Sequence, residues 1–340
     1  MTEKQYGGAT GRGTDKTQKS SSAAKPISKE MKKTEAPLKK EELDNLDVES
    51  NDNYIKAGKI ASEVVAYART IIKKGVPLLE IADKIEKKIV ELKGKPAFPV
   101  NLSINEIAAH DTPAYNDERV ASGLLKVDIG VHVNGCIADI AFSLDLEDNE
   151  ENKKLIIASE KALSGALEVI KEGIHIREIG SVIDKTIKSF GFTPIHNLSG
   201  HSIEPYMLHS GITIPNFDNS QEIRIDAGVY AIEPFATSGS GAVRDSKPSG
   251  IYRLEKEGAV RDSLAREILH FIEEEYQTLP FCSRWICKKF GPRALIALRR
   301  IEESKLLHHY PQLIEISGKK VSQAEHTIII QKEKKIITTA

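Results

Sequence analysis

The sequence is poor in the residue types that mark several classes of protein. Its 340 residues include only three cysteines, Cys136, Cys282 and Cys287, too few for the disulfide framework of a small secreted domain. Four residues separate Cys282 from Cys287, and no second cysteine pair accompanies them, so the spacing does not match a zinc site. We therefore expect buried or neutral thiols in a protein of a reducing compartment.

Long apolar runs and an excess of one charge are also missing. No run of about 18 apolar residues is present, so no transmembrane helix is expected. The N-terminus lacks the apolar segment of a secretory signal. The net charge of -1 gives the whole chain no bias toward nucleic acid. These absences favour a cytoplasmic protein without a membrane partner.

The first 52 residues differ in composition from the remainder. They are rich in Lys, Ser, Thr, Gly and Glu and contain few large apolar side chains, which predicts a disordered, charged N-terminal tail. Residues 1–40 hold ten Lys or Arg against four acids, whereas residues 41–52 hold six acids. Two interpretations remain open at this stage. The tail either only keeps the chain solvated, or binds ribosomal RNA or an acidic partner surface.

Residues 53–340 contain an internal repeat. Helical periodicity over residues 53–74 and 77–92 returns over residues 152–171 and 177–190. Seven identities at a spacing of 98 support the match: Lys73, Gly75, Glu80, Ile81, Ile85, Lys87 and Ile89 align with Lys171, Gly173, Glu178, Ile179, Ile183, Lys185 and Ile187. Asn101-Leu102-Ser103 then aligns with Asn197-Leu198-Ser199. Two copies of helix, helix and strands predict an α+β, pseudo-twofold fold whose central antiparallel sheet is flanked by helices.

One segment lies outside this repeat. Residues of about 250–315 are charged and helical in pattern, and they fall between the strand that precedes Glu233 and the strand that follows Glu325. We interpret them as an inserted helical subdomain.

Two aspartates in the first half are the sharpest local clue to chemistry. The strand Leu125–Val133 runs into Asn134-Gly135, the strongest short signal for a hairpin. Counting back from that turn pairs Gly130 with Asp139, so Asp128 and Asp139 share one sheet face as diagonal neighbours about 7–8 Å apart. They could be ordinary surface acids. Their apolar neighbours argue for a cation instead, because buried carboxylates are costly without one.

The second half supplies further candidate ligands. His201 follows Asn197-Leu198-Ser199-Gly200, and Glu233 and Glu325 each lie in an apolar strand context. Each of the three, taken alone, is more often structural. With the aspartate pair they form an oxygen-rich set with one imidazole, which suits two divalent ions such as Mn, Fe(II), Co or Zn. A dinuclear site of this kind is typical of metal-dependent hydrolases.

These residues resemble those of the type II methionine aminopeptidases, which have the pita-bread fold. The resemblance covers about residues 53–340, as one catalytic domain. Besides the two aspartates, it rests on these motifs: Lys95-Pro96-Ala97-Phe98-Pro99-Val100-Asn101, Ala108-Ala109-His110, Asn197-Leu198-Ser199-Gly200-His201, Ile214-Pro215-Asn216, Ala231-Ile232-Glu233-Pro234-Phe235-Ala236 and Glu325-His326-Thr327. The inserted segment resembles the insertion that separates type II from type I.

The resemblance implies a metal ligand set. Asp128 would chelate one ion, Asp139 and Glu325 would bridge both, and His201 and Glu233 would hold the second. Glu233 would also act as the general base toward the attacking water. The cofactors would be two divalent ions per chain, with Co, Mn, Fe(II) and Zn as the candidates.

The resemblance also implies a substrate and its contacts. His110 would contact the substrate, His209 would hydrogen-bond the scissile carbonyl, and Phe98 would line the pocket for the methionine side chain. The expected activity is removal of the initiator methionine from nascent polypeptides, preferentially when the second residue is small. We expect a cytoplasmic monomer that acts on nascent N-termini and could reach the ribosome through its basic tail.

Two other functions remain as alternatives. An Xaa-Pro peptidase or creatinase-like hydrolase on the same fold usually carries a separate N-terminal domain, whereas about 50 low-complexity residues precede the repeat here. A metal-free, ribosome- or RNA-associated binding protein on the same scaffold is expected to have lost ligands, whereas all five are present.

Overall fold

A computed structural model of the protein describes residues 40–332 and 334–340. Most of the predicted tail, residues 1–39, lies outside the described residues. Helix α1 (Lys40–Ile71) begins well before the expected start at Asn53, so residues 40–52 were wrongly assigned to the tail. The chain divides into two compact units between Leu43 and Asp44, and every strand belongs to the unit Asp44–Ala340.

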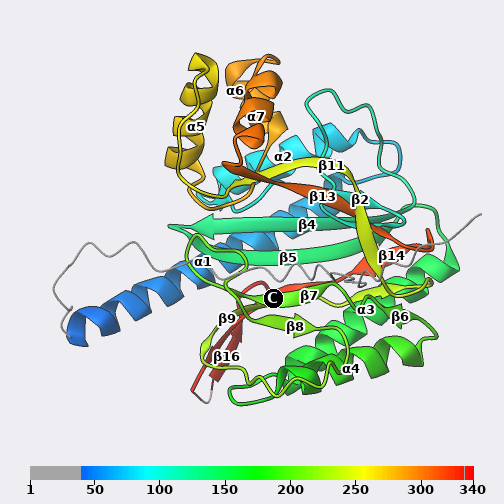
Figure 1. Ribbon diagram of the computed structural model, residues 1–340. Helices are drawn as coiled ribbons and strands as arrows, with labels where there is room; N and C mark the ends of the chain where they lie inside the picture. The colour runs from blue at the N-terminus through cyan, green and yellow to red at the C-terminus, as the bar shows by residue number, and fades with distance from the viewer. Residues whose placement is uncertain (1–39, 333) are drawn as a thin grey trace, which may run out of the picture. The chain divides into compact units, whose positions relative to one another are not determined.

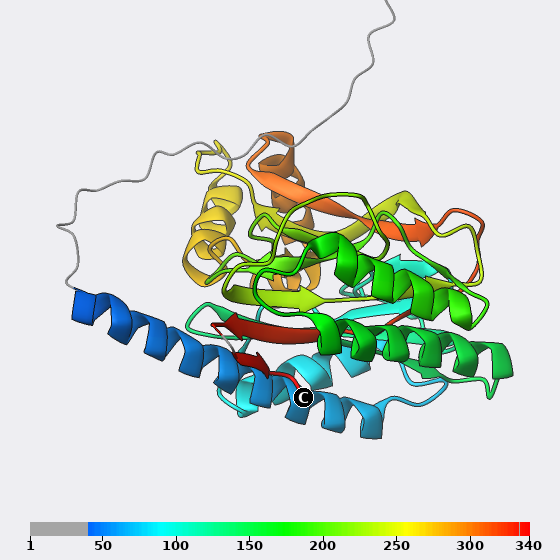
Figure 2. The same ribbon diagram turned by 90° about the horizontal axis from the view of Figure 1, so that it is seen from below.

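Each half of that unit contains two consecutive helices, as the repeat predicts. A glycine with positive φ follows the first helix of each pair, Gly75 at 86° and Gly173 at 80°, and allows the turn into the second helix. The first pair is α1 with α2 (Leu78–Glu91), and the second is α3 (Glu150–Val169) with α4 (Ile176–Ser189). Figure 2 shows α3 and α4 side by side, with α1 crossing the view in blue.

The first half is built on a long hairpin. Strands β4 (Leu124–Val133) and β5 (Cys136–Asp145) are joined by Asn134-Gly135, both with positive φ as a tight hairpin turn requires. The predicted register is confirmed, because Gly130 pairs with Asp139. Two short strands flank β4: β1 (Lys95–Pro96) and β2 (Asn101–Ile104).

The second half has a five-stranded antiparallel sheet in the order β16-β15-β9-β7-β8. The apolar strand around Glu233 is interrupted at Glu233-Pro234, because proline has no N–H to donate to a sheet ladder. The strands of this half are β6 (Thr193–Pro194), β7 (Ser199–Ile203), β8 (Thr213–Pro215), β9 (Gly228–Ile232), β10 (Phe235–Thr237), β14 (Val321–Gln323), β15 (His326–Gln331) and β16 (Lys334–Ile337). Of these, β6, β10 and β14 form a separate three-stranded sheet.

The two halves meet along β5. The backbone N–H of Glu325 donates to the carbonyl of Ala141 at 2.9 Å, an antiparallel bridge between a residue just before β15 and the first-half hairpin. Helices α1 and α2 pack with β4 and β5 around one apolar core, and α3 and α4 pack with β9 and β15 around another. In Figure 1 the long strands β4 and β5 lie between the inserted helices above and α3 and α4 below.

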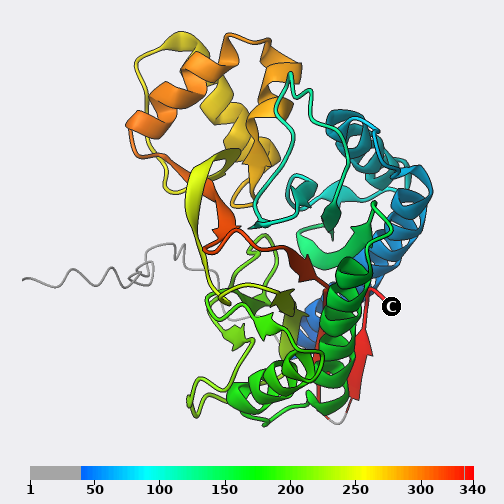
Figure 3. The same ribbon diagram turned by 90° about the vertical axis from the view of Figure 1, so that its right-hand side faces the viewer.

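The insertion is helical only in its middle. Three helices occupy residues 263–303, but both ends of the predicted segment are strands that pair with each other, so the all-helical expectation was wrong there. Ile251 and Tyr252, which lie in β11, are residue types that are enriched in strands. The elements are β11 (Val243–Leu254), α5 (Ser263–Glu275), β12 (Phe281–Cys282), α6 (Ser283–Phe290), α7 (Ala294–Glu303) and β13 (Leu307–Glu315). Figure 3 shows these helices at the opposite end of the view from α3 and α4.

Strand β13 also ties the insertion to the first half. It pairs with β3 (Ile107–Ala109), and Leu313 lies opposite Ala109. The residue after β3, His110, is thereby brought beside Tyr310 and Pro311.

The three cysteines of the chain are buried and form no disulfide with one another. Within the part of the chain that the structure describes, no helix has both the length and the apolar character needed to cross a membrane.

Candidate metal centre and substrate cavity

All eight site residues that the sequence suggested line one cavity of about 360 Å³, where the two halves and the base of the insertion meet. Five are the candidate metal ligands and three are the candidate substrate contacts. In chain order they are Phe98, His110, Asp128, Asp139, His201, His209, Glu233 and Glu325. Residues separated by more than 200 positions therefore share one site.

The candidate ligands converge at the floor of this cavity. Ligand atoms of Asp139, His201 and Glu325 all lie within 4.8 Å of one another. His201 Nε2 is 3.7 Å from Asp139 Oδ2 and 3.9 Å from Glu233 Oε1. These separations are too long for hydrogen bonds, yet they suit donors around one ion, because metal–nitrogen and metal–oxygen bonds of about 2.0–2.2 Å keep two such donors within about 4 Å.

The four carboxylates are held in an unfavourable electrostatic environment. Burial raises the pKa of Asp128 to about 7 and also raises the pKa of Asp139, Glu233 and Glu325, with repulsion from neighbouring carboxylates adding to the rise in these three. Among the described residues no lysine or arginine forms an ion pair with any of them. Asp128 Oδ1 and Asp139 Oδ1 also lack a hydrogen-bond partner there. Buried, uncompensated carboxylate oxygens of this kind fit divalent cations.

The histidines of the cavity are neutral groups. Burial lowers the pKa of His201 to about 4 and also lowers the pKa of His209 and His110. Neutral imidazole is the form that binds a metal or donates a single N–H to a substrate oxygen. The rings of His201 and His209 pack edge to face with centroids 4.3 Å apart, so His209 lies directly beside the candidate ligands.

Three polar residues in or next to the cavity were not among the predicted site residues. Gln323 Nε2 donates to Glu233 Oε2 at 3.4 Å. Asn197 Nδ2 donates to the carbonyl of Val243 at 2.7 Å, and the Val243 N–H donates back to Asn197 Oδ1 at 2.8 Å. Asn101, its counterpart in the repeat, has a buried Oδ1 without a partner. The aligned Asn-Leu-Ser triplets were the available signal for these two asparagines.

Much of the cavity lining is apolar, and we call this part of the lining the apolar wall. Phe98 lies over Gly130 of β4, so closely that a Cβ on this glycine would lie 2.3 Å from the phenyl ring. The other large apolar residues of the lining are Leu198, Leu208, Ile212, Phe235, Ile251 and Leu313. A cavity with an acidic floor and an apolar wall suits a ligand that has both an amine and an apolar side chain.

Comparison with known proteins identifies the family. Residues 52–332 match metallopeptidase family M24, and the match extends over most of the chain. The protein belongs to the M24 family. Metallopeptidases bind metal, so membership agrees with the cluster of Asp139, His201 and Glu325 and confirms the expectation of a metal-dependent hydrolase.

Several M24 relatives are similar to this chain over almost their whole length. A methionine aminopeptidase of Pyrococcus horikoshii is 45% identical over 293 residues, which cover 85% of this chain and 99% of the relative. A methionine aminopeptidase of Pyrococcus abyssi is 47% identical, and the match covers 85% of this chain and 99% of the relative. One from Saccharolobus solfataricus is 38% identical, with coverage of 83% and 95%.

Solved structures confirm the M24 fold. Methionine aminopeptidase from Thermotoga maritima superposes with a TM-score of 0.62 at 22% identity, covering 85% of this chain and 95% of that one. A thermophilic Arx1 superposes with a TM-score of 0.75 at 16% identity, covering 86% and 90%. Prolidase from Pyrococcus furiosus superposes with a TM-score of 0.56 at 19% identity, covering 86% of this chain and 64% of that one. The expected α+β fold with antiparallel sheets flanked by helices is confirmed.

Proposed function

We propose that this protein is a type II methionine aminopeptidase that removes the initiator methionine from nascent polypeptides, preferentially when the second residue is small. The observation that carries the proposal is the convergence of four carboxylates, of which Asp139 and Glu325 are fully buried, with His201 at the floor of a cavity with an apolar wall. The relatives named methionine aminopeptidase, which match over nearly their full length, supply the substrate. The insertion between β11 and β13 supports the type II assignment.

The ligand set would hold two divalent ions, with Co, Mn, Fe(II) and Zn as the candidates. Its members are Asp128, Asp139, His201, Glu233 and Glu325. Such ions, when bound, supply an activated water nucleophile and polarise the scissile carbonyl. Asp139 and Glu325 are the most deeply buried carboxylates of the set, and they come from opposite halves, so a complete ligand set would require both halves of the fold.

Glu233 is proposed as the general base. Its carboxylate lines the cavity 3.9 Å from His201 Nε2 and accepts a hydrogen bond from Gln323, which fixes its orientation. It would take the proton from the attacking water and pass it to the leaving amine.

The remaining cavity residues are proposed to bind the substrate. His209 would donate its N–H to the scissile carbonyl and stabilise the negative charge that develops on that oxygen. His110 would contact the substrate from the insertion side of the cavity, beside Tyr310. Phe98, on the apolar wall over Gly130, would pack against the methionine side chain.

The decisive experiment measures methionine release from Met-Ala-Ser and Met-Leu-Ser. The protein is stripped of metal with EDTA and then supplied with Co, Mn, Fe(II) or Zn in turn. Cleavage of the alanine peptide that returns with metal, and little cleavage of the leucine peptide, is the expected result. Preferential cleavage of an Xaa-Pro peptide would contradict the proposal and indicate a prolidase-like function instead.

The absence of cleavage with every metal would favour a binding protein on the same scaffold. Calorimetry with Mn or Co would then show whether the five residues bind ions. A stoichiometry of two ions per chain supports the dinuclear centre, and a stoichiometry of one contradicts it.

The expected surroundings of the enzyme are part of the same proposal. A cytoplasmic monomer that meets nascent chains as they emerge is consistent with an aminopeptidase of this kind. The basic residues 1–39, which lie outside the described residues, would make the contact with the ribosome. Unchanged co-sedimentation with ribosomes at low salt after deletion of residues 1–39 would remove that part of the proposal.

A further inference from the structure

His110 has an unusual backbone conformation. Its φ of 58° lies in the left-handed region, which a residue with a side chain occupies only at a cost in free energy. Its Nδ1 lies 3.2 Å from the carbonyl oxygen of Pro311. A carbonyl only accepts, so Nδ1 carries the proton and Nε2 keeps its lone pair. Whatever holds this conformation therefore sets where Nε2 lies in the cavity.

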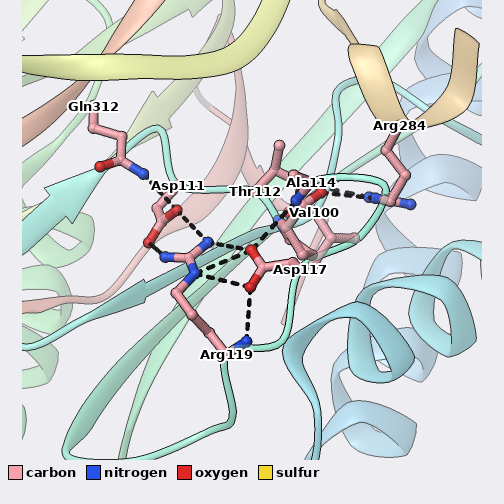
Figure 4. A network of polar contacts seen from close by, with 9 residues as sticks. Val100, Asp111, Thr112, Ala114, Asp117, Arg119, Arg284 and Gln312 are labelled. Carbon is pink, nitrogen blue, oxygen red and sulfur yellow. Dashed lines mark hydrogen bonds and ion pairs between the residues drawn. The ribbon is translucent and has the colours of Figure 1, made fainter. Parts of the chain in front are cut away.

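The next residue, Asp111, is fully buried and is held by two side chains. Arg119 donates from Nη1 and Nη2 to the two carboxylate oxygens at 2.8 and 3.0 Å. Gln312 Nε2 donates to Asp111 Oδ1 at 2.7 Å. Figure 4 shows the carboxylate between these two donors. We call Asp111, Arg119 and Gln312 the Asp111 clamp.

The clamp and the His110 contact are arranged as two adjacent pairs. Pro311 and Gln312, consecutive on β13, bind His110 and Asp111, which are consecutive after β3. The backbone N–H of Leu102 adds a hydrogen bond to the Asp111 carbonyl at 2.6 Å. A shift of Asp111 would therefore carry the His110 ring away from Pro311.

Arg284, which is buried whereas Arg119 is partly exposed, holds the same loop without touching His110 or Asp111. Arg284 of α6 donates from Nε to the carbonyl of Pro113 at 3.1 Å, and from Nη1 and Nη2 to the Glu86 carboxylate, each at 2.7 Å. Figure 4 shows Arg284 at the other end of the loop from Arg119. The Arg284–Glu86 pair is thus a natural control, because it anchors the loop but not His110.

We propose that the Asp111 clamp positions His110 for the reaction, so that Asp111, Arg119 and Gln312 are positioning residues of the site. Asp111 does not line the cavity, and its carboxylate oxygens are occupied by the two donors. The clamp acts by keeping the left-handed backbone and the Nδ1–Pro311 hydrogen bond in place. The kinetic part of the test rests on the proposed peptidase function, and the spectroscopic part does not.

The kinetic test is a double-mutant cycle on the metal-loaded full chain with Met-Ala-Ser. Asp111→Ala is expected to lower kcat/KM about ten-fold or more in the wild-type background, but less than about two-fold when His110 is already alanine. Asp111→Asn, which keeps an oxygen for Gln312, is expected to retain more activity. Equal losses in both backgrounds would show a merely structural role and overturn the proposal.

The spectroscopic test uses metal-free protein with isotope-labelled histidine. The imidazole signal of His110 is assigned by its loss in His110→Ala. It is expected to shift in Asp111→Ala and to remain in place in Glu86→Gln. Gln312→Ala, which leaves the Arg119–Asp111 pair intact, serves if Asp111→Ala does not fold. A His110 signal that stays unchanged in a folded clamp variant overturns the proposal, even if the wild type proves inactive on methionine peptides.

Discussion

Asp139 and Thr327 are joined by two hydrogen bonds across the boundary between the halves of the fold. The backbone N–H of Asp139 donates to Thr327 Oγ1 at 2.7 Å, and this hydroxyl donates to the Asp139 carbonyl at 2.8 Å. Asp139 is on β5, whereas Thr327 is on β15 and follows Glu325 by two positions. One hydroxyl therefore fixes the spacing between two candidate metal-binding carboxylates that belong to different halves.

Replacement of Thr327 by valine should weaken both stability and metal binding. Valine keeps the shape but leaves the buried N–H and carbonyl of Asp139 without partners, which costs about 1–3 kcal/mol of unfolding free energy. Metal affinity should fall with it, because Asp139 would no longer be held opposite Glu325. Urea unfolding of the metal-free protein and calorimetry with Mn would measure the two effects.

The control for this prediction is Thr237→Val. Thr237 is equally buried, and its hydroxyl donates to the carbonyl of Lys320 at 2.8 Å and accepts from the N–H of Gly239 at 3.0 Å. This variant should lose similar stability while keeping the metal affinity of the wild type. Equal losses of metal affinity in both variants would contradict the role given to Thr327.

Removal of one charge from the carboxylate cluster should stabilise the metal-free protein and impair metal binding. The pKa of Glu325 is raised by burial and by repulsion from Asp139 and Glu233. A raised carboxyl pKa means that folding becomes less favourable as pH rises above the ordinary value for glutamate. Glu325→Gln removes this cost, so we expect a gain of about 1–3 kcal/mol at about pH 8.

The same variant should gain little thermal stability from Mn or Co, whereas the wild-type Tm should rise with either ion. The measurement is a thermal shift of stripped protein with and without metal. Glu63→Gln, at an exposed ion pair with Lys88, should behave as the wild type. A metal-free Glu325→Gln protein less stable than the wild type would show that the carboxylates do not repel one another as described.

The hairpin and its aspartates could be predicted because the information is local. Asn134-Gly135 defines a tight turn, and the period of two along each strand then places Asp128 and Asp139 on the same face. The register in the structure is the predicted one. The repeat likewise placed both helix pairs, since helical periodicity and glycine stops depend only on neighbouring residues.

The parts that could not be predicted depend on distant contacts. Asp111 and Gln312 are 201 positions apart, and no local pattern marks them as partners. Charged residues at the ends of the insertion suggested helix, but pairing between β11 and β13 outweighs such weak local preference. The three-dimensional arrangement of the five candidate ligands was likewise beyond spacing alone. Their chemistry suggested a metal site, but only the resemblance to a known family gave each of them a role.

Enlarging Gly130 should disturb the apolar wall of the cavity. A Cβ at this position would lie 2.3 Å from the Phe98 ring, so Gly130→Ala must displace the phenyl group that is proposed to contact methionine. We expect KM for Met-Ala-Ser to rise about ten-fold with a smaller change in kcat, as for lost ground-state binding. Gly228→Ala is the control, because its added methyl would lie 3.4 Å from the Tyr230 ring, an ordinary contact. An unchanged KM in Gly130→Ala would argue against Phe98 as a substrate contact.

Glu315 should stabilise the end of β13 in a pH-dependent way. Its buried carboxylate accepts hydrogen bonds from the N–H and hydroxyl groups of Ser240 and Ser317 and from the N–H of Lys319, at 2.6–3.0 Å. These donors lower its pKa to about 2.

A carboxyl pKa that is lower in the folded than in the unfolded protein stabilises the fold above the unfolded value, and this contribution is lost as pH falls through the folded value. Glu315→Gln should therefore lower the unfolding free energy by about 2–3 kcal/mol at about pH 7, and the difference from the wild type should shrink between about pH 4.5 and pH 2. Urea unfolding of both proteins across this range measures the difference in unfolding free energy. The cavity carboxylates have the opposite pH dependence, but they are present in both proteins and so do not affect the difference. Glu303→Gln, at an exposed ion pair with Arg299, should give almost no difference at any pH. A difference for Glu315→Gln that stays constant with pH would mean that the charge of this carboxylate contributes nothing beyond its shape.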